Sequence, residues 1–217
     1  MNLVDSLVAH RLVPVIVADD ERSAAPLADA LIAGGLPVAE VTLRTPAALA
    51  VIRAMSRHDG LLVGAGTVLD ADQVDAAADA GAAFVVSPGL SRSVVERARE
   101  RGLLVVPGVA TATEAQAALA LGLDLVKFFP AETSGGAAAI KALSAPFAAL
   151  RFLPTGGIGP HNVMEYLDLP AVAAVGGSWM VPRDLVAQAD VTGLTALVAA
   201  AVDLVGASDR TKPDPRR

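Results

Sequence analysis

The chain has 217 residues, of which 53% are hydrophobic, and it carries a formal net charge of −6 and no cysteine. The acidic balance argues against nucleic acid as a partner, because few basic side chains are gathered to replace the counterions of a phosphate backbone. The absence of cysteine excludes disulfides, thiolate catalysis and cysteine metal sites and fits a cytoplasmic protein, and no apolar run reaches the length that a membrane span requires.

The first segment, residues 2–11, predicts a short extra helix. It lacks the positively charged start and the unbroken apolar stretch of a signal peptide. After it, short runs rich in β-branched apolar residues recur along the chain, and each predicts a buried parallel strand. The runs are 13–17, 38–43, 61–65, 84–87, 103–106, 125–129, 151–154 and 172–175.

Alanine-rich segments with helical spacing separate these runs. They are 25–33, 46–57, 71–80, 91–101, 113–121 and 137–143. Glycines just after the helical runs predict left-handed helix ends at Gly34, Gly60, Gly81, Gly102 and Gly122. The candidate N-caps are Asp70, Ser91 and either Thr111 or Thr113.

Eight such strand–helix units predict an α/β fold, a single-domain (β/α)₈ TIM barrel with the short N-terminal helix added. An open doubly wound sheet is the alternative, but regular units that nearly fill the chain favour closure. No linker interrupts the middle of the chain, so residues 1–207 form one predicted domain. Residues 208–217 are polar and proline-rich and predict a frayed C-terminal tail.

Polar side chains interrupt two of the predicted strands, and the first of these is 38–43. Residues of a strand alternate between its faces, so Glu40, Thr42 and Arg44 share one face and apolar residues share the other. A carboxylate and a guanidinium then point into the barrel together. Active sites of TIM barrels form at the carboxyl ends of the strands, so both are candidate site residues. A salt bridge that only satisfies itself inside the barrel is the alternative.

The second interrupted strand is 125–129, where Lys127 stands among apolar residues. Alternation puts Leu125, Lys127 and Phe129 on one face. Removal from water disfavours the ammonium form, and a neutral amine can attack a ketone and form an imine. The alternative is a lysine that extends its charge to solvent at the end of the sheet.

Further strand ends carry candidate site residues. The segment 64–67 (Gly-Ala-Gly-Thr) resembles the start of a dinucleotide fingerprint, but Leu69 stands where the third glycine belongs. A ligand that approaches the glycine backbone and accepts a hydrogen bond from Thr67 fits better. The turns 87–89 (Ser-Pro-Gly) and 107–108 (Pro-Gly) are rigid, and each either walls the site or simply reverses the chain.

Paired glycines follow the last two predicted strands. They are Gly156-Gly157, and Gly176-Gly177 followed by Ser178. TIM barrels frequently bind a phosphate at this position, where glycine lets backbone N–H groups approach the anion. The sequence therefore predicts a phosphate site here, with ordinary turn glycines as the alternative.

The histidines do not predict a metal site. His10, His58 and His161 lie far apart, none in a ligand-spaced pair, and the first two fall on predicted helical segments. No serine–histidine–aspartate arrangement is indicated. We therefore expect neither a metal nor another cofactor.

Six motifs occur in order along the chain. They are Glu-Val-Thr-Leu-Arg-Thr (40–45), Gly-Ala-Gly-Thr-Val-Leu (64–69), Ser-Pro-Gly-Leu (87–90), Lys-Phe-Phe-Pro-Ala-Glu (127–132), Pro-Thr-Gly-Gly-Ile (154–158) and Gly-Gly-Ser-Trp (176–179). From about residue 5 to residue 205 the chain resembles the family of 2-dehydro-3-deoxy-6-phosphogluconate and 4-hydroxy-2-oxoglutarate aldolases. These are class I aldolases, which use a lysine Schiff base and no metal.

The resemblance implies a carbon–carbon lyase that releases pyruvate together with glyceraldehyde 3-phosphate, and from 4-hydroxy-2-oxoglutarate together with glyoxylate. It implies Lys127 as the Schiff-base lysine and Glu40 as the general acid and base. The implied substrate-binding residues are Arg44, Thr67, Pro88, Phe129, Thr155, Gly156, Gly157, Gly176, Gly177 and Ser178. A phosphorylated 2-keto acid is the implied substrate, and a cytoplasmic homotrimer without nucleic-acid or membrane partners is the implied assembly.

Three other functions are alternatives to this one. Aldolases for the epimeric galactonate substrate tend to carry valine at the position of Thr155, so the threonine favours the gluconate substrate. A non-catalytic phosphate-binding barrel would keep the glycines and lose Lys127 or Glu40, and both are present. A phosphoribosyl isomerase barrel has no use for an imine-forming lysine.

Overall fold

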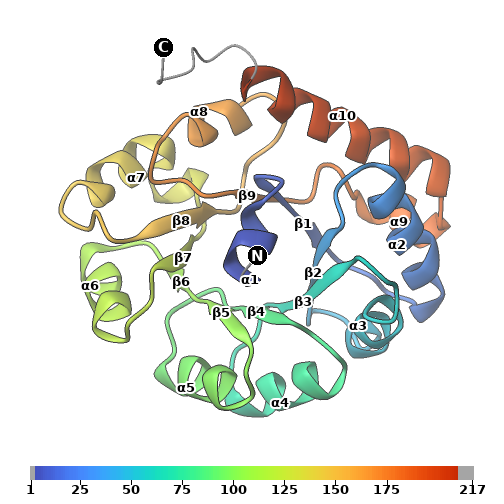
Figure 1. The fold of residues 1–217 in the computed structure, drawn as a ribbon, viewed down its shortest axis with the longest axis horizontal. Helices are drawn as coiled ribbons and strands as arrows, with labels where there is room; N and C mark the ends of the chain where they lie inside the picture. Colours follow the sequence, from blue (N-terminus) through green and yellow to red (C-terminus); the bar gives the residue numbers. More distant parts are fainter. Residues whose placement is uncertain (1–2, 210–217) are drawn as a thin grey trace.

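The computed structural model describes residues 3–209, a ring of parallel strands surrounded by helices (Figure 1). The strands are β1 (Leu12–Ile16), β2 (Val38–Thr42), β3 (Leu62–Gly66), β4 (Phe84–Val86), β5 (Leu104–Val106), β6 (Gly108–Val109), β7 (Leu125–Phe128), β8 (Arg151–Pro154) and β9 (Val175–Gly177). The helices are α1 (Leu3–Val8), α2 (Ala24–Ala33), α3 (Ala48–Met55), α4 (Ala71–Asp79), α5 (Arg92–Glu100), α6 (Ala112–Ala120), α7 (Gly136–Ser144), α8 (Val163–Leu167), α9 (Arg183–Gln188) and α10 (Val191–Asp209). Two short 3-10 helices, η1 (Glu21–Ser23) and η2 (Glu132–Ser134), lie in loops.

The strands close into a barrel. Hydrogen-bonded neighbours follow the order β9-β1-β2-β3-β4-β5 in one sheet and β6-β7-β8 in the other. Thr155 and Gly176 form a parallel bridge that joins the ends of β8 and β9. β5 and β6 act as one strand that Pro107 interrupts, since proline has no N–H to donate, while its carbonyl accepts from Lys127 N–H at 2.8 Å. The predicted (β/α)₈ barrel with its extra N-terminal helix is confirmed.

The last strand lies further along the chain than the sequence pattern predicted. The pattern placed it at 172–175, but β9 spans Val175–Gly177, and Val172 forms only an isolated bridge with Phe152. Glycine has a low propensity for strands, so the predicted strand stopped before Gly176. Parallel pairing with β1 overrides that propensity and holds both glycines in the sheet.

Side-chain caps begin several helices as predicted. The Asp70 side chain accepts from Gln73 N–H at the start of α4. Of the two threonine candidates Thr111 is the cap of α6, where it forms a reciprocal capping box with Glu114. Ser91 occupies the N-cap position of α5, but its side chain makes no capping hydrogen bond.

Three of the five predicted left-handed helix ends are confirmed, at Gly81, Gly102 and Gly122. Gly60 lies in the turn that follows α3, which already ends at Met55. Gly60, Gly81, Gly102 and Gly122 have positive φ. Gly34 has a right-handed φ of −76°, and the following Gly35 takes the positive φ of 79° instead. The left-handed residue therefore comes one position later than predicted, although α2 itself ends at Ala33. At the other end of the chain, α10 passes the predicted domain boundary at 207, and residues 210–217 of the predicted tail lie outside the described residues.

The N-terminal helix marks the amino end of the barrel. In Figure 1 α1 lies at the centre of the ring, and it leads directly into the amino end of β1. The carboxyl ends of the strands lie at the opposite end of the barrel, where TIM barrels build their active sites. None of the helices within residues 3–209 is both long and apolar enough to cross a membrane.

Candidate active site

A pocket of about 310 Å³ lies at the carboxyl ends of the strands. It is lined by Val15, Glu40, Thr42, Arg44, Thr67, Pro88, Lys127, Phe129 and Thr155. The pocket thus gathers every candidate side chain that the sequence singled out, apart from Ser178 and the glycines. Val15 was not predicted, because an apolar residue in an apolar strand gives no polar signal.

Lys127 and Glu40 meet across the barrel. β2 and β7 are not neighbours in the sheet, yet Lys127 Nζ donates to Glu40 Oε1 at 3.2 Å. The Lys127 side chain is 7% exposed and the Glu40 side chain 0% exposed, so the lysine does not extend its charge to solvent. The partner of Glu40 is thus Lys127, and not Arg44 as in the salt bridge that the sequence offered as an alternative. A buried amine hydrogen-bonded to a carboxylate is an arrangement suited to covalent catalysis with proton transfer.

Two oxygen atoms of the pocket residues have no hydrogen-bond partner among the described residues. They are Glu40 Oε2 and Thr155 Oγ1, and both are buried. Leaving a buried polar atom unsatisfied costs about 1–3 kcal/mol, so such atoms in a native structure call for an explanation. A polar ligand in the pocket can supply both missing hydrogen bonds.

Gly66 is required for the position of Glu40, and the sequence pattern did not reveal this requirement. Gly66 pairs with Thr42 on the neighbouring strand, and a Cβ added to it would lie 2.3 Å from Glu40 Oε1. Any larger residue would displace the carboxylate. Thr67 follows with a φ of 60°, a left-handed conformation that costs a non-glycine residue about 1–3 kcal/mol and is concentrated at functional sites.

Further contacts fix the walls of the pocket. Thr42 Oγ1 donates to the Ile16 carbonyl at 2.8 Å, which ties β2 to β1. The Phe129 ring lies below the lysine, with Lys127 Nζ 5.2 Å from the ring centroid. Such a contact stabilises a cation without giving it a hydrogen bond. The Lys127 amine therefore keeps hydrogen-bonding capacity for a ligand.

The first predicted glycine pair lies next to the pocket, directly after Thr155. Gly156 and Gly157 have φ values of 107° and 80°. Residues other than glycine rarely adopt this conformation, so the pair is required by the turn itself. The N–H group of Gly157 has no hydrogen-bond acceptor within residues 3–209, whereas Gly156 N–H faces the Gly176 carbonyl through the bridge between Thr155 and Gly176. The Gly157 N–H group is therefore available to a ligand, and an anion at this loop stays a prediction.

The second glycine pair has a packing reason that the sequence did not indicate. A Cβ on Gly176 would lie 2.3 Å from Thr155 Oγ1, and one on Gly177 would lie 1.8 Å from the Trp179 ring. Both glycines are buried, whereas Ser178 is exposed. The pair thus accommodates neighbouring side chains, and Ser178 is the member of this loop whose side chain reaches solvent.

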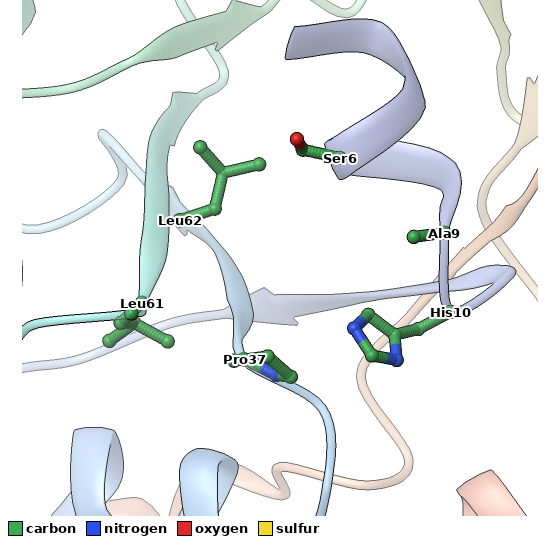
Figure 2. A pocket seen from close by; sticks show the side chains of 7 residues that line it. Ser6, Ala9, His10, Pro37, Leu61 and Leu62 are labelled. Carbon is green, nitrogen blue, oxygen red and sulfur yellow. The ribbon is translucent and has the colours of Figure 1, made fainter. Parts of the chain in front are cut away.

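The histidines lie elsewhere. His10 belongs to the turn after α1 and His58 to the turn after α3, so the prediction that both lie within helices was wrong. At the amino ends of the strands a pocket of about 350 Å³ is lined by Ser6, Ala9, His10, Pro37, Gly60, Leu61 and Leu62 (Figure 2). This lining contains no acidic side chain. Across residues 3–209, no three His, Asp or Glu side chains gather into a group that could hold a metal ion.

The chain is similar to proteins of known activity over most of its length. The model of the KDPG and KHG aldolase family matches residues 4–197. A 2-dehydro-3-deoxy-phosphogluconate aldolase of Zymomonas mobilis is 48% identical over 86% of this chain and 88% of its own.

Solved structures agree with the sequence match. The 2-keto-3-deoxy-6-phosphogluconate aldolase of Z. mobilis ZM4, crystallised with 3-phosphoglycerate, superimposes with a TM-score of 0.88 at 45% identity, covering 94% of this chain and 97% of its own. A KDPG aldolase of Legionella pneumophila, with pyruvate captured as a covalent carbinolamine intermediate, superimposes with a TM-score of 0.88 at 40% identity over 92% and 98% of the two chains.

Proposed function

This chain belongs to the KDPG and KHG aldolase family, and we propose on that basis that it cleaves 2-dehydro-3-deoxy-6-phosphogluconate to pyruvate and glyceraldehyde 3-phosphate. The observation that carries the proposal is the buried Lys127–Glu40 pair in a pocket at the carboxyl ends of the strands. Cleavage of 4-hydroxy-2-oxoglutarate to pyruvate and glyoxylate is the second reaction that the family name indicates. Both reactions make the enzyme a carbon–carbon lyase.

The first step is formation of the imine. Glu40 first takes a proton from the paired Lys127 ammonium, and the amine that results attacks the C2 carbonyl of the substrate to form a carbinolamine. Glu40 then returns that proton to the carbinolamine hydroxyl group, which leaves as water and gives a protonated imine. The covalent carbinolamine captured with pyruvate in the Legionella relative supports an amine as the attacking group. The apolar strand around Lys127 assists the step, because it keeps bulk water from competing for the amine.

Cleavage follows from the electron demand of the imine. The protonated imine draws the electron pair of the C3–C4 bond, and Glu40 accepts the proton of the C4 hydroxyl group. C4 becomes the aldehyde of glyceraldehyde 3-phosphate, and the electron pair remains as an enamine on the three-carbon fragment. Protonation of the enamine at C3 and addition of water to the resulting imine release pyruvate and restore the Lys127 amine. Glu40 contacts Lys127 directly and can serve each proton transfer, alone or through water.

The remaining pocket residues bind the substrate. Arg44 and Thr67 hold the pyruvyl carboxylate, because they supply a guanidinium and a hydroxyl donor at the ends of β2 and β3. Pro88 and Phe129 form apolar walls of the same pocket and limit the space around the reacting carbon. Gly156, Gly157, Gly176, Gly177 and Ser178 surround the phosphate.

Ser178 gives a direct test of the phosphate site. Its side chain is exposed, and its hydroxyl group can rotate to donate to a phosphate oxygen. We expect Ser178→Ala to lower kcat/KM for the phosphorylated substrate by about ten- to a hundredfold, since a hydrogen bond to a charged group contributes roughly 1.5–3 kcal/mol. Turnover of 4-hydroxy-2-oxoglutarate, which has no phosphate, should change much less. Equal losses on both substrates, or no loss on either, would remove Ser178 from the phosphate site.

The epimeric galactonate substrate defines the closest alternative. Thr155 Oγ1 is buried at the pocket wall and has no hydrogen-bond partner among residues 3–209, so it is available for a substrate hydroxyl group. A site built to hydrogen-bond a hydroxyl group discriminates strongly against a substrate that cannot use the bond. We therefore expect kcat/KM for the gluconate substrate to exceed that for the galactonate substrate by about tenfold or more, measured side by side through pyruvate release. Equal or faster turnover of the galactonate epimer would assign the chain to that substrate.

The assembly and the location of the protein are proposed from the family. We expect a homotrimer in the cytoplasm with a small-molecule substrate. The family membership supports both expectations, and sedimentation of the purified protein measures the first. A non-catalytic phosphate-binding barrel remains disfavoured, because the buried Lys127–Glu40 pair has no purpose in it.

A further inference from the structure

Two backbone hydrogen bonds orient the loop that follows β8. Ala131 N–H donates to the Thr155 carbonyl at 2.9 Å, and Glu132 N–H donates to the Gly156 carbonyl at 3.1 Å. The peptide bonds of this loop are trans, so each N–H points away from the carbonyl of the preceding residue. The N–H groups of Gly156 and Gly157 consequently point away from the Ala131–Glu132 segment.

Asn162 extends this arrangement by one peptide. Its side chain is buried, its Oδ1 accepts from Gly159 N–H at 2.8 Å, and its Nδ2 donates to the Gly157 carbonyl at 3.3 Å. The Gly157–Ile158 peptide is thereby turned so that Ile158 N–H points away from Asn162. Within the described part of the chain, Ile158 N–H has no acceptor. Successive free N–H groups of this kind form a concave site for an anion.

The Glu132 side chain supports the same loop from behind. A Cβ added to Gly157 would lie 2.6 Å from Glu132 Cγ, so the glutamate methylenes pack directly against the glycine. The Tyr166 hydroxyl donates to Glu132 Oε1 in a short hydrogen bond. Burial, together with this bond, raises the pKa of Tyr166, so the hydroxyl group stays protonated and remains a donor. Asn162 and Tyr166 are four residues apart along α8 and its N-cap, and so they share one face.

We infer that Asn162 is a positioning residue for the substrate phosphate, with the Tyr166–Glu132 contact as its support. Asn162 does not touch the substrate; it sets the orientation of the Gly157–Ile158 peptide and through it the direction of Ile158 N–H. This inference rests on the proposed function, because it assumes a phosphorylated ligand. It adds Ile158 N–H to the phosphate-binding groups and gives α8 a part in substrate affinity.

Two substitutions test the role. Asn162→Asp keeps the shape and the acceptor for Gly159 N–H, but it sets a carboxylate oxygen against the Gly157 carbonyl. Asn162→Ala removes the donor without adding charge, so agreement between the two variants excludes simple charge repulsion. In both we expect 3-phosphoglycerate, titrated by calorimetry, to bind about tenfold more weakly. KM for the phosphorylated substrate should rise by a similar factor while kcat changes less than about twofold.

A matched control is the neighbouring His161. Its side chain is exposed, so His161→Ala should leave both the 3-phosphoglycerate affinity and the KM for the phosphorylated substrate unchanged. Tyr166→Phe keeps the ring and removes the hydroxyl group, and a loss of about threefold in 3-phosphoglycerate affinity is expected with the fold intact.

The outcomes separate this inference from the proposed function. Calorimetry needs no cleavage, so wild-type protein that binds 3-phosphoglycerate but cleaves nothing would contradict the proposed function alone. Unweakened binding in both Asn162 variants overturns the positioning role, whatever their activity. So does a fall in kcat at unchanged KM, an equal loss on 4-hydroxy-2-oxoglutarate, or a wild-type protein that binds no 3-phosphoglycerate.

Discussion

Cleavage by the Lys127→Ala variant is expected to fall by on the order of 10⁶-fold, the scale on which loss of a covalent nucleophile slows other enzymes. The amine is the atom that bonds to the substrate, and no neighbouring group in the pocket can replace it: the other pocket residues carry a carboxylate, a guanidinium, hydroxyl groups and apolar side chains. Steady-state release of pyruvate, coupled to a dehydrogenase, measures the effect.

Removing Lys127 also leaves Glu40 without its ion-pair partner. An unpaired buried charge destabilises a protein by about 3–5 kcal/mol, so lost activity must be separated from lost folding. Lys127→Arg keeps a cation beside Glu40, but its guanidinium stays protonated and cannot form the imine. The exposed Lys141 provides the control, since Lys141→Ala should retain full activity. Turnover in a folded Lys127→Arg variant within about tenfold of wild type would contradict the role of Lys127.

Glu40→Gln should lower kcat by on the order of 10²–10⁴-fold, the usual range for a general acid–base group. The amide retains the shape of the side chain, and its oxygen can still accept from Lys127 Nζ, but it cannot take the proton of the substrate hydroxyl group. Pre-steady-state and steady-state rates with the phosphorylated substrate measure the loss. The substitution removes a charge from beside Lys127, which can also change stability. The thermal unfolding of the Glu40→Gln variant is therefore compared with that of the wild-type protein.

The partial reaction distinguishes proton transfer from binding in this variant. Imine formation with pyruvate should survive in part, because the Lys127 amine is still present. Near-normal turnover of the phosphorylated substrate by Glu40→Gln would count decisively against Glu40 as the base. Loss of activity together with a collapsed fold would instead require the comparison to be made with Glu40→Asp, which keeps the charge and shortens the reach.

The inward-facing groups were predictable because strand geometry is simple. Side chains alternate with a period of two, so Glu40, Thr42 and Arg44 had to share a face once the segment was recognised as a strand. The same argument oriented Lys127 and Phe129. All five line the pocket.

The partner of Glu40 was not predictable in the same way. Alternation defines a face but not what lies across the lumen, and β2 and β7 are not adjacent in the sheet. The lysine–glutamate contact depends on barrel closure and on the clearance that Gly66 provides. The orientation of the Gly157–Ile158 peptide likewise depends on Asn162, which reaches back from the start of the next helix.

Local propensity misled where tertiary pairing decided the structure. Gly176 and Gly177 belong to β9 because β1 pairs with them, although glycine itself disfavours strands. Their lack of side chains is explained by the bulk of Thr155 and Trp179. A single sequence cannot distinguish that requirement from the need to admit an anion.

The most direct test of the account is reductive trapping with pyruvate. Incubation of the wild-type protein with pyruvate and borohydride should inactivate it and add one reduced pyruvyl group, and peptide mass mapping should locate that group on Lys127. The chain has two other lysines as internal controls, Lys141 and Lys212. Modification of Lys127 alone is the result that the account predicts. Modification at Lys141 or Lys212 with Lys127 unmodified, or full activity after exhaustive treatment, would contradict it.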